Sequence, residues 1–339
     1  MLMKKYNVAI CGATGAVGET MLKVLKERNF PVEKLKLFAS YKSKGRKYKF
    51  LNQDIFVEEL TKDSFKDTEI ALFSIGAGLS KEFAPIAVEN GATVIDNSSA
   101  FRMDKNVPLI IPEVNPEDVS WHNGIIANPN CSTLIMVVAI NPIHKISRIK
   151  RIVTSTYQAV SGTGRKAIEE LKKQSRAVLD GEKVTSKVYP VQIAFNVLPH
   201  IEDFYDNGYT KEEMKMVHET HKIMGDNSIR ITATTVRVPV FTSHSLSVNL
   251  ELESKLTKEE VRDILSKAPG LKVMDDPENL IYPTTLNSSG NDLVYVGRIR
   301  EDDSVENGLN LWIVSDQLRK GAATNAIQIA EILIEKNLV

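Results

Sequence analysis

Three glycines spaced three residues apart, Gly12, Gly15 and Gly18, follow a short apolar run and precede a stretch with helical periodicity. Glycines at such a strand-to-helix turn allow close backbone approach, and the N–H groups that open the helix can bind a pyrophosphate. The spacing differs from the commonest dinucleotide fingerprint, so an ordinary tight turn is the alternative. The residues predicted to contact a dinucleotide are Gly12, Thr14, Gly15, Ala16 and Val17.

The first third of the chain alternates apolar runs with helical segments. The runs are residues 8–11, 35–39, 70–75, 93–95 and 125–127, and the helical segments include 19–26 and 80–89. This alternation indicates a parallel sheet with crossover helices, the α/β arrangement of a Rossmann-type dinucleotide-binding domain. After about residue 128 the pattern becomes mixed. Helices are predicted from 132 and 164 and at 211–224 and 322–335, and β-rich runs lie at 149–158, 229–238 and 245–250.

Composition excludes several classes of partner. The 43 Lys and Arg residues balance 43 Asp and Glu residues, so no net charge attracts nucleic acid or an anionic membrane. The longest apolar run, residues 134–140, is far shorter than the roughly 20 residues that span a bilayer, and no apolar leader precedes the first strand. We therefore expect a cytoplasmic protein that binds small molecules.

The second apolar run is followed by hydroxyl and cationic side chains, because residues 40–46 read Ser-Tyr-Lys-Ser-Lys-Gly-Arg. An NAD enzyme usually has an acidic residue here that binds the ribose 2′-hydroxyl. Hydroxyls and cations instead suit a dianionic 2′-phosphate. The segment predicts NADP, with contacts from Ser40, Lys42 and Ser43, and the alternative is a solvated basic loop.

The two cysteines, Cys11 and Cys131, are too few for a disulfide framework, and with six scattered histidines they lack metal-site spacing, so no metal is expected. Cys131 stands at the start of a predicted helix, where the helix dipole stabilises a thiolate. A catalytic and a structural thiol are both open there. Cys11 lies inside an apolar strand and is better explained as structural.

Four motifs occur in one order along the chain. They are Gly12 to Gly18, Asn130-Cys131-Ser132-Thr133, Gln158-Ala159-Val160-Ser161-Gly162-Thr163-Gly164 and Arg237-Val238-Pro239-Val240-Phe241-Thr242-Ser243-His244. In order and spacing they resemble the aspartate-semialdehyde dehydrogenase family, as do residues 294–300 and 321–325. The resemblance runs from about residue 6 to the C-terminal helix.

The resemblance implies roles for three residues in catalysis. Cys131 corresponds to the nucleophile, Gln158 to a residue that orients the thioester intermediate, and His244 to the acid/base group that takes the thiol proton. An imidazole that titrates near pH 6.5 is suited to moving a proton at physiological pH.

The resemblance also implies a substrate site. Arg237 matches the family arginine that grips the substrate carboxylate, and Arg102 and Lys215 match the residues that hold phosphate. Glu212 matches the glutamate that meets the substrate ammonium group. Glu212 and Lys215 share one helix face, so on spacing alone an ordinary surface ion pair is the simpler interpretation. Glu213 is spaced off that face.

Further cofactor contacts are implied at Ser161, Gly162 and Asn325. The chain departs from the family in residues 74–79, where Gly78 and Leu79 replace the expected small hydroxyl residues, so contacts from that loop are not assigned. Nothing is assigned in residues 181–197.

The implied architecture is an NADP-binding domain over 1–129, completed by the C-terminal helix 319–339, and an α+β catalytic and dimerisation domain over 130–318. The implied reaction is the reversible, NADPH-dependent reductive dephosphorylation of L-aspartyl 4-phosphate to L-aspartate 4-semialdehyde, in the biosynthesis of lysine, threonine, methionine and isoleucine. The implied assembly is a homodimer, with a tetramer as the alternative. Rival interpretations are N-acetyl-γ-glutamyl-phosphate reductase and a non-catalytic dinucleotide-binding paralogue, but the presence of Cys131, Gln158, Arg237 and His244 argues against the latter.

Overall fold

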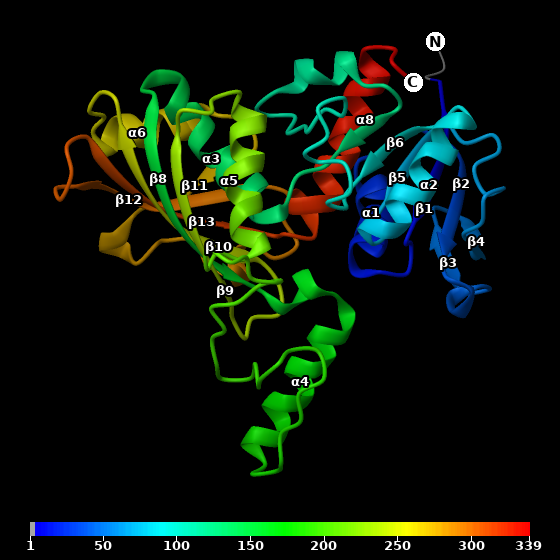
Figure 1. Cartoon of the computed structure of the whole chain (residues 1–339), viewed down its shortest axis with the longest axis horizontal. Coiled ribbons are helices and arrows are strands. Elements are labelled where there is room, and N and C mark those ends of the chain that lie inside the picture. The colour runs from blue at the N-terminus through cyan, green and yellow to red at the C-terminus, as the bar shows by residue number, and fades with distance from the viewer. Residues whose placement is uncertain (1–3) are drawn as a thin grey trace. The chain divides into compact units, whose positions relative to one another are not determined.

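The computed structural model describes residues 4–339, which divide into two compact units. Unit 1 comprises the chain up to Asn130 together with Ala322–Val339, and unit 2 comprises Cys131–Gly321. Each unit has its own sheet (Figure 1). None of the helices in residues 4–339 combines the length and the apolar character needed to cross a membrane.

Unit 1 contains a seven-stranded sheet in the order β3-β4-β2-β1-β5-β6-β7, parallel except for the β3-β4 hairpin. The strands are β1 Tyr6–Cys11, β2 Val32–Ala39, β3 Lys47–Phe50, β4 Gln53–Glu59, β5 Ile70–Phe73, β6 Thr93–Asp96 and β7 Ile125–Ala127. The helices are α1 Ala16–Glu27, α2 Ala77–Glu89 and α8 Asn325–Glu335. The predicted Rossmann-type α/β fold is confirmed.

Both faces of the unit 1 sheet are covered, which explains its continuous apolar strands. Side chains alternate along β1, so that Val8 and Ile10 pack in a cluster with residues of α1 and α8. Ala9 and Cys11 pack in the other cluster, with residues of α2. The helices therefore lie on opposite faces of the sheet, and the carboxyl end of β1 opens directly into the glycine loop.

Unit 2 contains a mixed six-stranded sheet in the order β11-β12-β13-β10-β8-β9. The strands are β8 Ile149–Gln158, β9 Arg230–Arg237, β10 His244–Leu252, β11 Leu271–Val273, β12 Val294–Asp302 and β13 Gly308–Ser315. The helices are α3 Cys131–Ile146, α4 Arg165–Leu179, α5 Lys211–Met224, α6 Lys258–Lys267 and the single turn α7 Thr285–Ser288. Short 3-10 turns are η1 Tyr41–Ser43 and η2 Pro116–Trp121 in unit 1, and η3 Val160–Thr163 and η4 Pro277–Asn279 in unit 2.

Helix α3 forms the core of unit 2. Every residue of α3 from 132 to 141 is buried, and the helix contacts β8, β10, β12 and β13. A helix that is apolar on all sides is expected to be enclosed by its neighbours. Because α3 starts at Cys131, the buried helix fixes the position of this thiol within unit 2.

The final helix begins later than expected. The sequence predicts a helix over 322–335, whereas residues Arg319–Thr324 form a π-helical turn and α8 begins at Asn325. A π turn is wider than an α-helical turn and is often found at functional sites. The expected start is therefore wrong by one turn, although the rest of the helix is confirmed.

Candidate active site

The glycine loop of unit 1 requires glycine at two positions. Gly12 has a φ of +86°, and a Cβ at this position would lie 2.2 Å from the carbonyl oxygen of Ser74. A Cβ at Gly18 would lie 2.2 Å from the carbonyl oxygen of Gly12. Both distances are far inside van der Waals contact, so the loop packs tightly between the end of β1 and the start of α1. This geometry leaves the N-terminal N–H groups of α1 close to the sheet edge.

The loop after β2 lies beside the glycine loop. The hydroxyl oxygens of Thr14 and Ser43 are 3.4 Å apart. Ser40 precedes the 3-10 turn η1, and the side chain of Lys42 in that turn is exposed. Predicted cofactor residues from two different loops of unit 1 are therefore neighbours, and together they offer backbone N–H groups, hydroxyls and a cation. These are the groups that bind phosphates.

A buried network of amides surrounds the predicted residues Arg102 and Asn325. The Nδ2 group of Asn325 donates to the Oδ1 of Asn128 at 2.7 Å and to the carbonyl of Ile110 at 3.0 Å. Arg102 donates from Nε to the carbonyl of Asn128 at 2.9 Å and from Nη2 to the carbonyl of Asn97 at 2.7 Å. The network fixes the backbone of Asn128, three residues before Cys131 in the chain.

In unit 2, Cys131 is half-buried and is the first residue of α3. A Cβ at Gly321 would lie 3.1 Å from the Cβ of Cys131 and 3.3 Å from the Cβ of Gln317. Gly321 therefore allows the backbone to approach the cysteine closely, and Gln317 lies next to the same position. The start of a long helix stabilises a thiolate.

Gln317 joins three parts of the site, although the sequence gives no reason to select it. Its side chain is buried, its Nε2 donates to the hydroxyl of Ser161, and its Oε1 accepts the N–H of Ser243 at 2.7 Å. Ser243 directly precedes His244. Gln317 thereby connects the surroundings of Cys131 with the turn at Ser161 and with the start of β10.

His244 presents one ring nitrogen for chemistry. Its Nδ1 accepts the N–H of Ala159 at 3.0 Å, and a backbone N–H can only donate, so the neutral ring carries its proton on Nε2. Nε2 is buried and has no hydrogen-bond partner among the described residues. Burial and then the Arg237 guanidinium lower the pKa of His244 to about 3, and the Glu212 carboxylate opposes this change. The ring is therefore neutral near pH 7 and donates from Nε2.

Arg237 presents a second buried donor. Its Nη1 donates to the carbonyl of Ala159 at 2.8 Å, and no described residue accepts a hydrogen bond from its buried Nε. A Cβ at Gly162 would lie 3.2 Å from Nη1 of Arg237 and 3.4 Å from Nε2 of His244, so the glycine keeps open the space next to both groups. An unsatisfied buried donor costs about 1–3 kcal/mol. The arrangement indicates a site for an anionic or oxygen-rich ligand.

Gln158 and Glu212 also meet in this site. The Nε2 of Gln158 donates to Oε1 of Glu212 at 3.2 Å, and Lys215 lies 3.3 Å from the other oxygen of Glu212. The ion pair expected from spacing is therefore present. Glu212 is nevertheless buried and contacts Gln158, which an ordinary surface pair does not do. Glu213 caps α5 through Thr210, as expected for a residue off that face.

Unit 2 thus connects eight of the predicted site residues, with catalytic, substrate and cofactor roles, through direct contacts or shared partners. They are Cys131, Gln158, Ser161, Gly162, Glu212, Lys215, Arg237 and His244. The remaining predicted site residues belong to unit 1 and are Gly12, Thr14, Gly15, Ala16, Val17, Ser40, Lys42, Ser43, Arg102 and Asn325. No group of three or more His, Cys, Asp or Glu side chains within residues 4–339 is placed to hold a metal ion.

The chain matches known families over both units. Residues 7–122 match the family described as "Semialdehyde dehydrogenase, NAD binding domain", and residues 140–320 match "Semialdehyde dehydrogenase, dimerisation domain". The sequence is 55% identical over 338 residues to the aspartate-semialdehyde dehydrogenase of Aquifex aeolicus, covering 98% of this chain and 99% of that protein.

Solved structures agree with the sequence comparison. Aspartate semialdehyde dehydrogenase II of Vibrio cholerae, solved in complex with ASA, has a TM-score of 0.96 and 48% identity and covers 98% of this chain and 99% of its own. The enzyme of Candida albicans, solved with NADP, has a TM-score of 0.78 and 26% identity, covering 99% of this chain and 100% of its own. These full-length matches show that the chain belongs to the aspartate-semialdehyde dehydrogenase family.

Proposed function

We propose that this protein catalyses the reversible, NADPH-dependent reductive dephosphorylation of L-aspartyl 4-phosphate to L-aspartate 4-semialdehyde, through a thioester on Cys131. Two buried donors support this proposal most directly, Nε of Arg237 and Nε2 of His244. Neither has an acceptor among the described residues, and both residues lie next to Gly162, which has no side chain to fill the space beside them. The relative from Vibrio cholerae, which shares 48% of its residues with this chain, was solved with ASA bound.

Cys131 is the group that attacks. Its thiolate forms a bond to the acyl carbon of aspartyl phosphate, and the carbon–oxygen bond to phosphate breaks, so that inorganic phosphate leaves and a thioester remains. The N-terminal position on α3 supports this role, because the helix dipole favours the negative sulfur. Covalent catalysis divides one difficult displacement into two easier steps.

His244 is the acid/base group, and its geometry supports the donating part of that role. The neutral ring can donate from Nε2 to the oxygen that becomes negative when sulfur attacks the carbonyl. Taking the thiol proton on Nε2 first requires that the ring lose its proton from this nitrogen, which would place Nδ1–H against the N–H of Ala159. We therefore assign the resting Nε2–H to stabilisation of the oxyanion. Nε2 can donate its proton to that oxygen and takes the proton back when the intermediate collapses.

The charges around His244 fit the substrate. The Nε edge of Arg237 can grip the α-carboxylate, and the buried carboxylate of Glu212 can meet the ammonium group. Gln158 donates to Glu212, and this contact supports the proposed role of Gln158 in orienting the acyl group. Lys215 and Arg102 are the groups assigned to phosphate.

NADP fits the loops of unit 1. Gly12 and Gly18 keep the backbone close to the start of α1, Thr14 and Ser43 are adjacent, and Lys42 adds a cation that suits a 2′-phosphate. The remaining assigned contacts are Gly15, Ala16, Val17, Ser40, Ser161, Gly162 and Asn325. When bound, the reduced cofactor supplies the hydride that converts the thioester to the aldehyde level.

The assembly is proposed to be a homodimer formed through the open face of the unit 2 sheet. Along β8, Thr154 and Thr156 are buried, whereas Val153, Ser155 and Tyr157 on the other face are partly exposed. Ser155 pairs with Ser247 on β10. The match of residues 140–320 to a dimerisation domain supports this use of the sheet.

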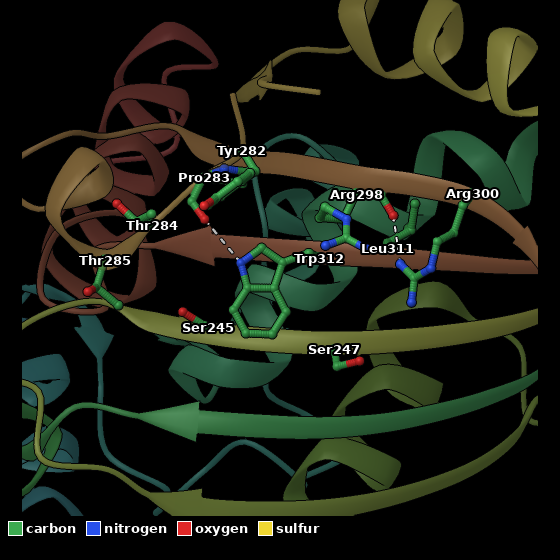
Figure 2. Close-up of a pocket in the computed structure, with 10 residues that line it drawn as sticks. All are labelled: Ser245, Ser247, Tyr282, Pro283, Thr284, Thr285, Arg298, Arg300, Leu311 and Trp312. Carbon is green, nitrogen blue, oxygen red and sulfur yellow. Dashed lines mark hydrogen bonds between the residues drawn. The ribbon is translucent and has the colours of Figure 1, made fainter. Parts of the chain in front are cut away.

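Trp312 occupies the centre of this open face (Figure 2). Its indole N–H donates to the carbonyl of Pro283 at 3.1 Å, and its ring lies 5.5 Å from that of Tyr157. A pocket of about 610 Å³ lies here, with Arg298 and Arg300 along one side. Aromatic and arginine side chains are enriched at interfaces between proteins. The cytoplasmic location and a tetrameric assembly stay predictions.

The nearest rival reaction uses a substrate whose amine is acylated and therefore uncharged. The buried carboxylate of Glu212 favours a cationic amine, because a substrate ammonium group would add a charge-assisted contact to this carboxylate that a neutral amide cannot make. This favours aspartyl phosphate over N-acetyl-γ-glutamyl phosphate.

The direct test is an assay of purified protein with aspartate semialdehyde, phosphate and NADP⁺, followed at the absorbance of NADPH. We expect sustained NADPH formation that NAD⁺ supports poorly. The matched rival substrate is N-acetylglutamate semialdehyde. Faster turnover of that aldehyde than of aspartate semialdehyde would refute the proposed substrate.

A further inference from the structure

The buried face of helix α4 carries two polar side chains where apolar side chains are usual. Its buried residues are Ala167, Glu170, Leu171 and Gln174, which are spaced as neighbours on one helix face. A buried carboxylate or amide is costly unless it is hydrogen-bonded. Glu170 and Gln174 are therefore expected to hydrogen-bond to specific partners.

Glu170 binds three successive backbone N–H groups. One carboxylate oxygen accepts from Lys187 and from Val188, each at 2.7 Å, and the other accepts from Tyr189 at 3.2 Å. These bonds are charge-assisted and so are stronger than bonds between neutral groups. A single side chain thus fixes the direction of the chain at residues 187–189.

Gln174 completes the attachment. Its Oε1 accepts the N–H of Ile193 at 2.9 Å and of Ala194 at 3.2 Å, and its Nε2 donates to the carbonyl of Thr185 at 3.1 Å. Residues 185–194 contain no helix or strand, so these side chains supply partners that regular structure would otherwise provide. In Figure 1 the chain after α4 runs back beside this helix.

The attached segment reaches the substrate site of unit 2 at two points. The hydroxyl of Tyr189 donates to Oγ1 of Thr163 at 2.9 Å, and Thr163 directly follows Gly162. Leu198 exchanges two backbone hydrogen bonds with Arg237, at 2.9 Å and 2.8 Å. Burial raises the pKa of Tyr189, and the guanidinium of Arg237 opposes this rise.

We propose that Glu170 is a positioning residue for the substrate site: its carboxylate fixes residues 187–189, and through Tyr189 and Thr163 it holds the turn that places Gly162 beside Arg237 and His244. The inference rests on the proposed function, because it assumes that the substrate carboxylate binds at Arg237. Loss of the attachment is expected to loosen the aldehyde site, whereas the loops that bind NADP in unit 1 are unaffected.

Hydrogen exchange measures the attachment itself. In Glu170→Gln the amide has one acceptor oxygen and turns two donors toward the backbone N–H groups, so the amides of residues 187–189 are expected to exchange about tenfold faster. Glu169→Gln is the matched control, since Glu169 is the exposed neighbour on α4 and the substitution changes the net charge equally. Exchange in β8 should stay the same in both variants.

Steady-state kinetics measure how loss of the attachment by Glu170 affects the substrate site. In Glu170→Gln the KM for aspartate semialdehyde is expected to rise about fivefold or more while kcat falls less, because the geometry at Arg237 changes. The KM for NADP⁺ is expected to rise by a smaller factor, because this turn supplies only Ser161 and Gly162 of the assigned cofactor contacts. Tyr189→Phe removes only the hydroxyl that donates to Thr163. It should raise the same KM without faster exchange at 187–189, and it tests the route even where Glu170→Gln folds poorly.

Unchanged exchange at residues 187–189 in Glu170→Gln would overturn the proposal. So would an active enzyme in which Glu170→Gln and Tyr189→Phe both keep the wild-type KM for the aldehyde. A wild-type protein without activity on aspartate semialdehyde would instead refute the proposed function and the kinetic part of this inference, while the exchange comparison still decides whether Glu170 holds the segment.

Discussion

At the scale of single residues, the two cysteines differ in their surroundings. Cys11 is fully buried in the core of unit 1, and burial raises its pKa far above the usual range, so its thiol stays protonated. Cys131 is half-buried at the start of a helix. The reactivity of a cysteine increases with the fraction of thiolate and with the exposure of the sulfur to solvent. The two thiols are therefore expected to behave differently toward the same reagent.

Iodoacetamide should label Cys131 and inactivate the enzyme, and aspartate semialdehyde should protect it. Cys131→Ala should remove turnover while the Kd for NADP⁺ stays within about twofold, because the thiol makes the thioester and unit 1 binds the cofactor. Mass spectrometry and cofactor titration provide the measurements. Cys11→Ala is the control and should keep most of the rate. Substantial turnover in Cys131→Ala would contradict covalent catalysis.

His244 makes stability depend on pH. Its pKa is lowered to about 3 in the folded protein, below the value near 6.5 of an unfolded chain. As the pH falls below 6.5, the unfolded state binds a proton that the folded state does not, so stability is lost progressively down to about pH 3. Between pH 6.5 and 5 the loss should reach about 2 kcal/mol.

Denaturant unfolding of wild type and His244→Asn at pH 7 and pH 5 isolates this contribution, since all other groups respond alike in the two proteins. The wild type should lose more stability over this interval than the variant. Parallel losses would show that His244 is not held neutral by its surroundings.

The sequence predicts those site residues that stand in short motifs. Cys131, Gln158 and His244 are each recognisable within a few neighbouring residues. Gln317 and Glu170 are not, because their function lies in contacts made by folding: Gln317 reaches Ser161, 156 positions away, and Glu170 binds a segment 17 to 19 positions along the chain. Local sequence gives no sign of such contacts.

At the scale of elements, the regular parts of the fold follow from the sequence and the irregular parts do not. Strand β8 and helix α5 occupy the predicted ranges, because period-two and helical patterns are strong there. The π turn at Arg319–Thr324 is missed, since its residues fit a helical pattern. Residues 185–194 show no periodic pattern because they form no helix or strand, and side chains of α4 bind their backbone instead.

The glycine loop gives a prediction at this scale. In Gly18→Ala the added Cβ meets the Gly12 carbonyl, a backbone atom that cannot move aside, so we expect a loss of stability of about 2 kcal/mol or more and weaker NADP⁺ binding. Thermal unfolding and cofactor titration measure both effects. Gly78→Ala is the matched control in unit 1, because a Cβ there meets nothing within 4 Å and α2 favours alanine. Equal melting temperatures for the two variants would contradict this account.

At the scale of the whole molecule, the open face of the unit 2 sheet is the proposed dimer interface. Ser247 lies between Ser155 and Trp312 on this face. In Ser247→Glu a charge would be buried between two copies of the chain. The dissociation constant of the dimer should therefore be at least about tenfold higher than that of the wild type. Ser266→Glu, on an exposed position of α6, is the control and should leave the dimer unchanged. Light scattering coupled to gel filtration measures the mass.

A wild-type protein that is monomeric at micromolar concentration would refute the proposed dimer. A Ser247→Glu variant that stays dimeric would place the interface on another surface of the chain.

Cys131 is proposed to form a thioester that phosphate, not water, cleaves. The most direct test follows NADPH after mixing the enzyme with aspartate semialdehyde and NADP⁺ in phosphate-free buffer. We predict a single burst equal to the concentration of active sites, then a stall, and steady turnover with a saturable dependence once phosphate is added. Lys215→Leu should raise the phosphate requirement more than the NADP⁺ requirement, because it removes a charge-assisted contact to that anion. Sustained NADPH production without phosphate, with aspartate as the product, would contradict the account and place the enzyme among hydrolytic aldehyde dehydrogenases.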